Sequence, residues 1–375
     1  MRVLFSTISL DAERGGGTAQ RTRFLARYLT RAGVSCQVVT MEDGDLTAGL
    51  RVEGVSVYCT GALRIPYHLP WLNMRALDRL TRDADVLHLL GYWNFLSVAL
   101  AWLARRHAKP YVLSAAGEFA ALHHGSPVKR VFHALFGSRM IAGAAAIITV
   151  TSRERAQVIE WFGLPHESVI VLPNGVEPAS NGSASNGLLP GEQPFVLFMG
   201  RLAPIKGPDL LIEAFAEIAQ RHPDVALVFA GPDGGLLGDL RARRGALGLD
   251  ERVVFTGYLG EAARREAYNR SLLLVVPSRD EAMSLVALEA GALGRPVLLT
   301  DRCGFDEVAE VGGGLTVPAS VGGLRDGLEA LLADRAGLLE MGARLQTYVG
   351  LHYSWPALAQ QLLASLRKMT TGTLR

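Results

Sequence analysis

The chain alternates short runs of apolar, strand-forming residues with longer segments in which apolar residues recur every three or four positions. The first pattern predicts buried strands, and the second predicts amphipathic helices such as residues 19–29 and 210–219. Because strands and helices alternate throughout, we expect an α/β fold with parallel sheets covered on both faces, and a doubly wound sheet in each half. The expected strands are residues 3–8, 36–41, 55–59, 86–90, 111–114, 146–150 and 169–172 in the first half, and 195–199, 226–230, 253–255, 272–276, 297–300 and 315–317 in the second.

Residues 177–193 interrupt this pattern. They are rich in Gly, Ser, Asn and Pro and contain almost nothing to bury, which predicts a linker. We therefore expect one domain at residues 1–176, a second at residues 194–350, and an amphipathic helical segment at residues 351–375. A length of 375 residues suits two domains of ordinary size.

Composition excludes several classes of protein. A hydrophobic content of 49% and a charged content of 20% describe a globular chain and not a disordered one. The three cysteines are far apart and match neither a zinc site nor a disulfide framework, which favours a reducing compartment such as the cytoplasm. No apolar run reaches the roughly 18 residues of a membrane-spanning helix, and the first apolar run reads as a core strand and not as a signal peptide.

The net charge of +2 hides a difference between the two halves. Residues 1–175 carry 19 basic and 13 acidic residues (19 − 13 = +6), whereas residues 176–375 carry 19 and 23 (19 − 23 = −4). The basic first half fits either a solvated face or contact with anionic lipid head groups. Nucleic acid is a poorer partner, because the chain lacks a platform of interleaved basic and aromatic residues.

The stretch from Glu281 to Glu289 carries the most chemical information. Its two carboxylates stand eight positions apart, across the predicted end of a strand, a turn and the start of a helix. The free N–H groups of a helix N-terminus suit an anion. An anion flanked by two carboxylates that can accept hydrogen bonds from hydroxyls suggests a sugar nucleotide.

Arg201 and Lys206 follow another predicted strand and are bracketed by Gly200 and Gly207. A sugar nucleotide leaves as a nucleoside diphosphate, so negative charge grows on the leaving group in the transition state. Two cations directed at that charge could do the work of a metal ion. The alternative is a pair of surface cations in a loop.

Four segments together resemble the retaining GT-B glycosyltransferases of family GT4 (group 1). The Glu-x7-Glu stretch with residues 290–297 resembles the donor-site signature of that family, and residues 198–207 resemble its diphosphate clamp. Residues 171–177 resemble its interdomain crossing, and residues 15–17 resemble its N-terminal glycine loop. The resemblance covers nearly the whole chain.

This resemblance implies the GT-B fold, with two Rossmann-like domains facing a central cleft and a last helix that crosses back onto the first domain. It places Arg201 and Lys206 on the diphosphate, Glu281 beside hydroxyls of the transferred sugar, and Glu289 on the ribose hydroxyls. Arg201, Lys206 and Glu281 are therefore the expected catalytic residues.

The other donor-site candidates are glycines after the first strand, two residues expected near the nucleobase, and residues whose amides would meet the phosphates and sugar. They are Gly16, Gly17, Tyr258, Leu259, Met283, Ser284 and Leu285. The glycine loop lacks the third glycine of a dinucleotide fingerprint, which disfavours an NAD site and leaves a plain flexible turn as the alternative.

One position departs from the family. Relatives often carry a histidine where this chain has Ala116, so the role of that histidine near the donor sugar is open. His88, Glu118, His123 and His124 are possible substitutes, and His88 and Glu118 are our acceptor-side candidates. A histidine packed in the core is the alternative for His88.

No metal or cofactor is expected. Two Asp-x-Asp triplets, residues 43–45 and 83–85, could hold a divalent cation, but both lie outside the donor half and read as structural. No lysine of the second domain is placed to carry pyridoxal phosphate. We expect transfer that does not depend on a metal.

The resemblance implies a retaining hexosyltransferase that moves a sugar from a nucleoside-diphosphate sugar to a hydroxyl of a glycan or lipid-linked glycan. UDP is the favoured nucleotide and GDP the second, in bacterial polysaccharide, lipopolysaccharide or glycolipid synthesis. The expected location is cytoplasmic, as a peripheral protein on the inner face of the membrane. Alternatives are a sugar-nucleotide epimerase or hydrolase of the GT-B fold, which would need no acceptor, and a non-catalytic module that only binds nucleotide sugars.

Overall fold

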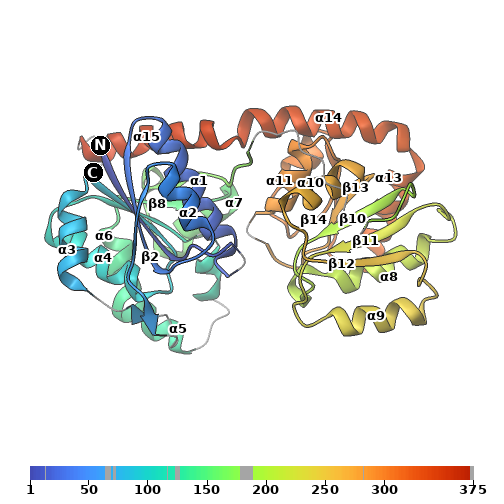
Figure 1. Ribbon diagram of the computed structural model, residues 1–375, viewed down its shortest axis with the longest axis horizontal. Helices are drawn as coiled ribbons and strands as arrows, with labels where there is room; N and C mark the ends of the chain where they lie inside the picture. Colours follow the sequence, from blue (N-terminus) through green and yellow to red (C-terminus); the bar gives the residue numbers. More distant parts are fainter. Residues whose placement is uncertain are drawn as a thin grey trace. The chain divides into compact units, whose positions relative to one another are not determined.

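The computed structural model describes residues 1–12, 14–63, 69–70, 73–115, 117–122, 127–177, 189–281 and 283–371. The chain divides into two compact units (Figure 1). The first unit comprises Met1–Gly175 together with Trp355–Arg375, and the second comprises Val176–Ser354. The last helix of the chain therefore belongs to the first unit. Most of the expected linker lies outside the described residues.

The first unit is built on a seven-stranded parallel sheet with the order β3-β2-β1-β6-β7-β8-β9. All seven strands expected in this half are present. The central strands β6, β7 and β8 are mainly apolar and buried along their whole length, whereas the edge strand β3 is partly exposed. Their bounds are β1 Arg2–Ser9, β2 Ser35–Glu42, β3 Ser56–Cys59, β6 Val86–Leu90, β7 Tyr111–Ser114, β8 Ala146–Thr149 and β9 Val169–Val171. Two short antiparallel strands, β4 Ala62–Leu63 and β5 Leu69–Pro70, lie outside this sheet.

Helices cover both faces of that sheet. On one face α1 and α15 pack together over β1 and β6, and on the other face α4 packs on the sheet and on α3 and α6. The helices are α1 Gly16–Arg31, α2 Leu46–Val52, α3 Met74–Asp83, α4 Phe95–Arg106, α5 Pro127–Phe132, α6 Ser138–Gly143, α7 Ser152–Phe162 and α15 Trp355–Thr370. Shorter helical turns are η1 Glu118–Leu122, the π-helical η2 His133–Gly137 and η3 His166–Ser168.

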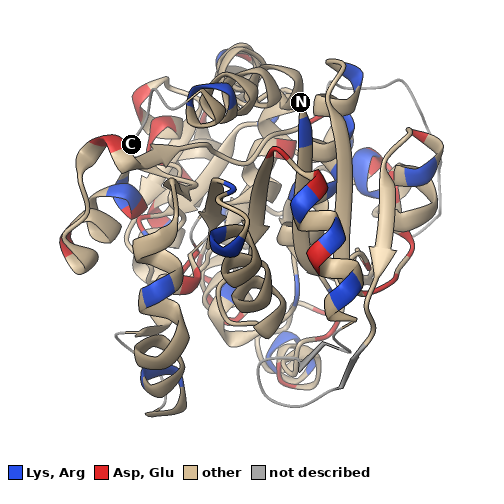
Figure 2. Ribbon diagram, turned by 90° about the vertical axis from the view of Figure 1, so that its left-hand side faces the viewer, with Lys and Arg blue, Asp and Glu red and all other residues tan. Residues whose placement is uncertain are grey.

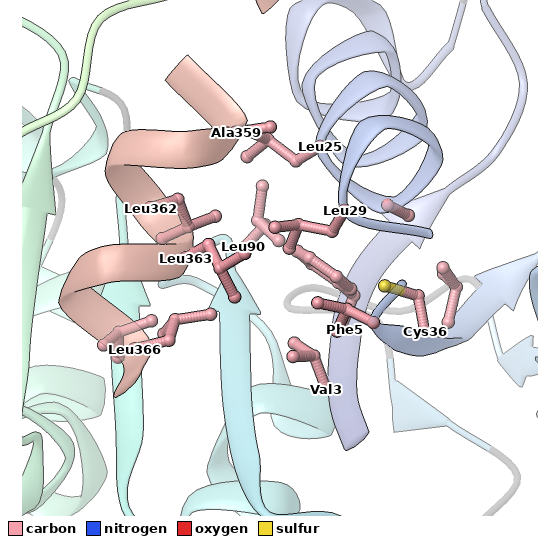
Figure 3. Close-up of a cluster of buried hydrophobic side chains, with 14 of the residues drawn as sticks. Val3, Phe5, Leu25, Leu29, Cys36, Leu90, Ala359, Leu362, Leu363 and Leu366 are labelled. Atoms are coloured by element: carbon pink, nitrogen blue, oxygen red, sulfur yellow. The ribbon is translucent and has the colours of Figure 1, made fainter. Parts of the chain in front are cut away.

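The C-terminal helix α15 is a full member of the first core. Figure 3 shows Ala359, Leu362 and Leu363 of α15 facing Leu25 and Leu29 of α1 above the sheet. At the start of α15, Trp355 stacks on Phe24 with ring centroids 5.2 Å apart. A Cβ added at Gly175 would come 2.7 Å from the Trp355 ring, so the last residue before the second unit also packs on this helix.

The second unit holds a six-stranded parallel sheet with the order β12-β11-β10-β13-β14-β15. Helices α8 and α13 cover one face, and α11 packs with α14. The strands are β10 Phe195–Met199, β11 Ala226–Ala230, β12 Val253–Gly257, β13 Leu273–Val276, β14 Val297–Thr300 and β15 Gly314–Val317. The helices are η4 Pro204–Lys206, α8 Pro208–Ile218, α9 Leu237–Ala246, α10 Glu261–Arg270, α11 Leu285–Ala292, α12 Glu307–Glu310, α13 Val321–Ala333 and α14 Arg335–His352.

In each sheet, the direction in which successive strands are added changes once. In the first unit the reversal falls between β1 and β6, and in the second it falls between β10 and β13. Each unit is therefore a doubly wound, Rossmann-like α/β structure, as the alternation of strands and helices predicts. In such sheets ligands bind at the carboxyl ends of the strands on either side of this switch point. In the parts of the chain that the structure describes, no helix combines the length and the apolar composition needed to cross a membrane.

Candidate functional site

The loops that follow β10 and β13 meet at the switch point of the second sheet. Gly207, which ends the short helix η4, has a φ of 66°, in the left-handed region that favours glycine. A Cβ at this position would overlap the carbonyl oxygen of Pro277, which directly follows β13. The two loops therefore pack backbone against backbone, and this glycine allows the approach.

Arg279, in the loop that follows β13, forms hydrogen bonds to the loop that follows β10. Its backbone N–H donates to the carbonyl oxygen of Ile205 over 2.8 Å, and its guanidinium donates to that of Pro204 over 2.5 Å. The guanidinium also forms a bidentate pair with Asp209, with distances of 2.8 and 2.6 Å. Burial raises the pKa of Asp209, but the hydrogen bonds and the charge of Arg279, with smaller contributions from a backbone hydrogen bond and the charge of Arg243, together hold that pKa below the usual value.

This packing brings Lys206 and Glu281 into contact. The Lys206 Nζ lies 3.0 Å from Glu281 Oε1, and the hydroxyl of Ser278 donates to Glu281 Oε2 over 2.9 Å. The backbone N–H of Glu281 donates to the carbonyl oxygen of Arg302 over 2.9 Å. A cation and a carboxylate predicted as site residues from separate segments therefore form one pair.

Arg201 lies on the same loop as Lys206 but is exposed. Its aliphatic stem packs on Gly234, where an added Cβ would come 2.8 Å from Arg201 Cγ and 2.8 Å from Ala203 Cβ. Among the described residues, no carboxylate forms an ion pair with the Arg201 guanidinium. Its charge is therefore available to an anion.

The buried thiol of Cys303 contacts the end of β13, where the loop that carries Glu281 begins. The Cys303 sulfur lies 3.2 Å from Thr300 Oγ1 and 3.4 Å from the carbonyl oxygen of Val276. Thr300 in turn donates to the carbonyl oxygen of Ser278 over 2.5 Å. Burial raises the pKa of Cys303 to about 11, so the thiol stays protonated and joins the ends of β13 and β14. No sequence pattern indicates this role.

Helix α11 begins at Leu285, immediately after these loops. Ser284 is its N-cap, and the Ser284 hydroxyl accepts a hydrogen bond from the Ala287 N–H over 3.4 Å. Met283 and Ser284 are buried, so their side chains serve packing and capping. What these residues can offer an anion is the backbone at the start of the helix.

Glu289 points from α11 toward α10, where two residues hold it. The Tyr268 hydroxyl donates to Glu289 Oε2 over 2.8 Å, and Arg264 Nη1 lies 3.4 Å from Glu289 Oε1. Burial, and then the charge of Glu289, raise the pKa of Tyr268 well above its usual value, so the phenol remains a donor. Sequence reasoning missed Arg264 and Tyr268. Their spacing of four places them on one face of α10, but nothing in the sequence links that face to Glu289.

The two residues proposed to lie near the base differ in exposure. Tyr258 is 68% exposed, whereas Leu259 is buried. Tyr258 also interacts electrostatically with Arg264, the partner of Glu289. Of the two, Tyr258 offers an accessible ring face.

In the first unit, Gly15 is the N-cap of α1, and Gly16 and Gly17 lie inside the helix. Gly16 is the first residue of α1 and has a φ of 52°, which again favours glycine. Gly17 belongs to the same first turn. At Gly15 a Cβ would come 2.6 Å from that of Ala19, so this turn has little room for side chains.

His88 lies in the middle of β6 and is fully buried, with its ring 5.3 Å from that of Phe5. Neither ring nitrogen has a hydrogen-bond partner within the described part of the chain. Burial, and then the charge of Arg21, lower the pKa of His88 to about 3. The ring is therefore neutral, and its position matches the alternative of a core histidine.

Glu118 binds backbone and not another side chain. Its Oε2 accepts the N–H groups of Tyr92 and Trp93 over 2.6 and 3.3 Å. Desolvation raises the pKa of Glu118, and these hydrogen bonds oppose the rise. Ala116, His123 and His124 lie outside the described residues.

Three carboxylates of the two Asp-x-Asp triplets already accept hydrogen bonds from other residues of the first unit. Asp43 accepts the hydroxyl of Thr47, Asp45 accepts the N–H of Ala12 over 2.8 Å, and Asp85 accepts the N–H of Arg2 over 2.7 Å. Within the described ranges, no group of three or more His, Cys, Asp or Glu residues is arranged to hold a metal ion.

Two family models account for most of the sequence. The glycosyl transferase 4-like domain matches residues 16–175, and the glycosyl transferases group 1 model matches residues 183–349. The chain belongs to the group 1, or GT4, glycosyltransferases. The boundary between the two matches falls near the boundary between the two units.

Relatives of this GT4 chain include D-inositol 3-phosphate glycosyltransferases. That of Nocardia farcinica is 35% identical over 301 residues, which cover 75% of this chain and 66% of the relative. That of Kineococcus radiotolerans is 30% identical over 350 residues, covering 84% and 74%. The match thus spans about two thirds of the length of the Nocardia relative. An uncharacterized glycosyltransferase of Methanocaldococcus jannaschii is 29% identical over 386 residues and covers 96% of both chains.

Solved structures show the same fold. Anabaena HepE, in complex with UDP and glucose, superposes with a TM-score of 0.77 at 20% identity and covers 98% of this chain and 100% of HepE. WaaG, a glycosyltransferase involved in lipopolysaccharide biosynthesis, has a TM-score of 0.71 at 19% identity, with coverages of 96% and 99%. The GT-B fold of this GT4 member is therefore shown.

Proposed function

We propose that this protein transfers a hexose from a nucleoside-diphosphate sugar to an acceptor hydroxyl, with retention of configuration and without a metal ion. The observation that carries the proposal is the contact between Lys206 and Glu281, made by the loops that follow β10 and β13. Arg201 lies on the first of these loops, and α11 begins just after the second. Cations, a carboxylate and a helix N-terminus thus gather where an open α/β sheet binds its ligand.

Arg201 and Lys206 would stabilise the charge that develops on the departing diphosphate. At an effective dielectric constant of about 20, a cation about 4 Å from a unit charge contributes about 4 kcal/mol before desolvation. A contribution of about 1.4 kcal/mol already changes a rate tenfold. Because the proposed mechanism uses no protein nucleophile, this leaving-group stabilisation would be the main catalytic contribution.

The carboxylates would position the donor. Glu281 can accept hydrogen bonds from hydroxyls of the transferred sugar, and its pairing with Lys206 keeps both charges compensated while the site is empty. Glu289, held by Tyr268 and Arg264, would accept the ribose hydroxyls. Tyr258 offers a ring on which the base could stack.

UDP is the favoured nucleotide and GDP the second, and the structural likeness to HepE, whose crystals contain UDP, supports that order. The acceptor would be a glycan or a lipid-linked glycan in bacterial polysaccharide or glycolipid synthesis. We place the protein on the inner face of the membrane as a peripheral enzyme. The similarity to D-inositol 3-phosphate glycosyltransferases adds phosphorylated cyclitols to the acceptors worth testing.

Three measurements test the proposal. Thermal shifts with UDP-, GDP- and ADP-sugars should raise the melting temperature most for the true donor, because a ligand that binds the folded state stabilises it. NMR of the transfer product should then show the anomeric configuration of the donor, and chelator should leave the rate unchanged. Release of nucleotide or of an epimer at the same rate with and without acceptor would instead identify a hydrolase or epimerase. Binding without turnover under all conditions would identify a non-catalytic module.

A further inference from the structure

Residues 86–153 of the first unit are almost free of acidic side chains. They contain seven Lys and Arg residues and a single acid, Glu118. That carboxylate already accepts the backbone N–H groups of Tyr92 and Trp93. It also interacts electrostatically with Lys129, so the other cations of the segment, Arg130 and Arg139 among them, have no further carboxylate within it.

Within this segment, α5, η2 and α6 follow one another from Pro127 to Gly143 without a break. One side faces the core, where Phe132 packs against Trp93 and Phe95. Met140 is buried on the same side. The outer side is not needed for this packing.

The outer side is apolar and basic. Val128, Val131 and Leu135 are 56%, 56% and 54% exposed, at the spacing of one helical stripe. Arg130 and Arg139 are exposed beside them. We call these five residues the α5–α6 stripe.

The neighbouring helix α4, which packs on α6, also carries an exposed apolar residue beside a basic one. Its Trp102 is 54% exposed, and the guanidinium of Arg106 lies 5.7 Å from the centre of the indole ring. Figure 2 views the first unit from the side on which α3, α4 and α6 are labelled in Figure 1, with basic residues in blue and acidic residues in red.

Exposed apolar residues of the second unit have different surroundings. Leu339 and Leu351 on α14 are 70% and 69% exposed, but Leu339 is followed directly by Glu340. Arg335 and Arg344 lie on the same helix, but they pair with Asp224 and Glu340. This makes Leu339 and Leu351 a matched control for the stripe of the first unit.

We propose that the α5–α6 stripe, with Trp102 and Arg106, docks the protein onto an anionic lipid surface. Val128, Val131 and Leu135 would enter the boundary between head groups and acyl chains, and Arg130 and Arg139 would lie at the head-group phosphates. An anionic bilayer satisfies both halves of this surface, because an interfacial helix combines an apolar stripe with basic residues. A polynucleotide would leave the aliphatic side chains unused. The inference rests on the proposed function in one respect: docking would bring a lipid-linked acceptor to the enzyme.

The test is flotation of the full chain with vesicles of phosphatidylcholine and phosphatidylglycerol in equal amounts, compared with vesicles of phosphatidylcholine alone. We expect binding to the anionic vesicles only. The double variant R130E/R139E should bind at least tenfold more weakly, since each cation near such a surface adds to the attraction. The variant V131S/L135S should also lose most of its binding, because it loses apolar area that enters the interface.

Matched variants separate this surface from general charge and hydrophobicity. R241E/R367E makes the same change in net charge on α9 and α15, and L339S/L351S removes the same kind of apolar area from α14. Both should float like the unaltered chain. Equal loss in R130E/R139E and R241E/R367E, or no binding to anionic vesicles by the unaltered chain, would overturn the proposal.

Two further outcomes would also overturn it. One is tighter binding to a single-stranded polynucleotide than to the vesicles, lost in R130E/R139E but kept in V131S/L135S. The other is a dimer in solution that V131S/L135S converts to a monomer, since the stripe would then cover a second copy of the chain. Thermal shifts with sugar nucleotides are measured on the same preparations. Vesicle binding without any nucleotide response would contradict the proposed function and leave the lipid surface standing.

Discussion

The two units have the same strand order around their switch points but use their charged side chains differently. In the first unit, Glu118 and Glu154 accept backbone N–H groups, and Arg21 donates to the carbonyl oxygens of Leu172 and Pro173. At the switch point of the second unit, Lys206 instead pairs with the side chain of Glu281, between the loops that follow β10 and β13. A charge bound to backbone stabilises one conformation, whereas a charge paired with another side chain can exchange that partner for a ligand. The difference indicates which charges serve the fold and which serve chemistry.

The largest expected effect is on turnover. Replacing Arg201 or Lys206 by Ala should lower kcat by about 10²-fold or more, the usual result of removing one group that stabilises developing charge. Initial rates of transfer measure it, and Arg241→Ala, an exposed arginine of α9, serves as the control. Near-normal rates in both variants would remove these cations from the mechanism.

The next prediction concerns the contribution of Glu118 to the stability of the first unit. Glu118→Ala leaves the N–H groups of Tyr92 and Trp93 without their acceptor, so the free energy of unfolding should fall by about 2–3 kcal/mol. Urea denaturation followed by tryptophan fluorescence measures the change. Turnover per folded molecule should stay normal if the carboxylate serves the fold. A loss of turnover without a loss of stability would return Glu118 to the acceptor site.

A smaller effect is expected at Glu289. Tyr268→Phe removes one hydrogen bond to this carboxylate, so the KM for the sugar nucleotide should rise about fivefold while kcat stays nearly constant. Tyr111→Phe is the matched control, because that buried hydroxyl donates to the carbonyl oxygen of Met140 over 2.6 Å in the first unit. Both variants should lose similar stability. Equal KM values in the two would show that Glu289 needs no support from Tyr268.

The smallest effect concerns the pairing of Asp209 with Arg279. Because the folded pKa of Asp209 is lowered, the pair stabilises the protein above the unfolded pKa of about 3.9 and loses that contribution as the pH falls through the folded value. Asp209→Asn should cost about 1 kcal/mol near neutral pH, allowing for partial exposure. The difference in stability from the unaltered chain should narrow between about pH 5 and pH 3 in urea titrations. A difference independent of pH would mean that the ion pair adds nothing.

Much of the fold follows from local pattern. Runs such as residues 195–199 and 272–276 are apolar without interruption, so burial on both faces could be inferred directly. Arg201, Lys206 and Glu281 could be selected because each follows such a run. The contact between Lys206 and Glu281 could not be derived, because it depends on how two loops pack around Gly207 and Pro277.

Other features were beyond reach of the sequence for a similar physical reason. Arg279 joins two loops, and Cys303 joins the ends of two strands, through bonds between residues distant along the chain. Glu118 binds backbone N–H groups and Arg21 binds backbone carbonyl oxygens. Such backbone partners leave no trace in the pattern of side chains along the sequence. Sequence patterns report burial well but do not report which buried partner a polar group will find.

The contact between Gly175 and Trp355 bears on how the protein is made. The second unit is inserted between these two residues, so the core shared by α1 and α15 cannot be completed until the ribosome has added the final helix. The second unit, whose sequence is complete at Ser354, can finish folding earlier. The half that is synthesised first therefore matures last, which reverses the usual N-to-C order of domain folding during translation.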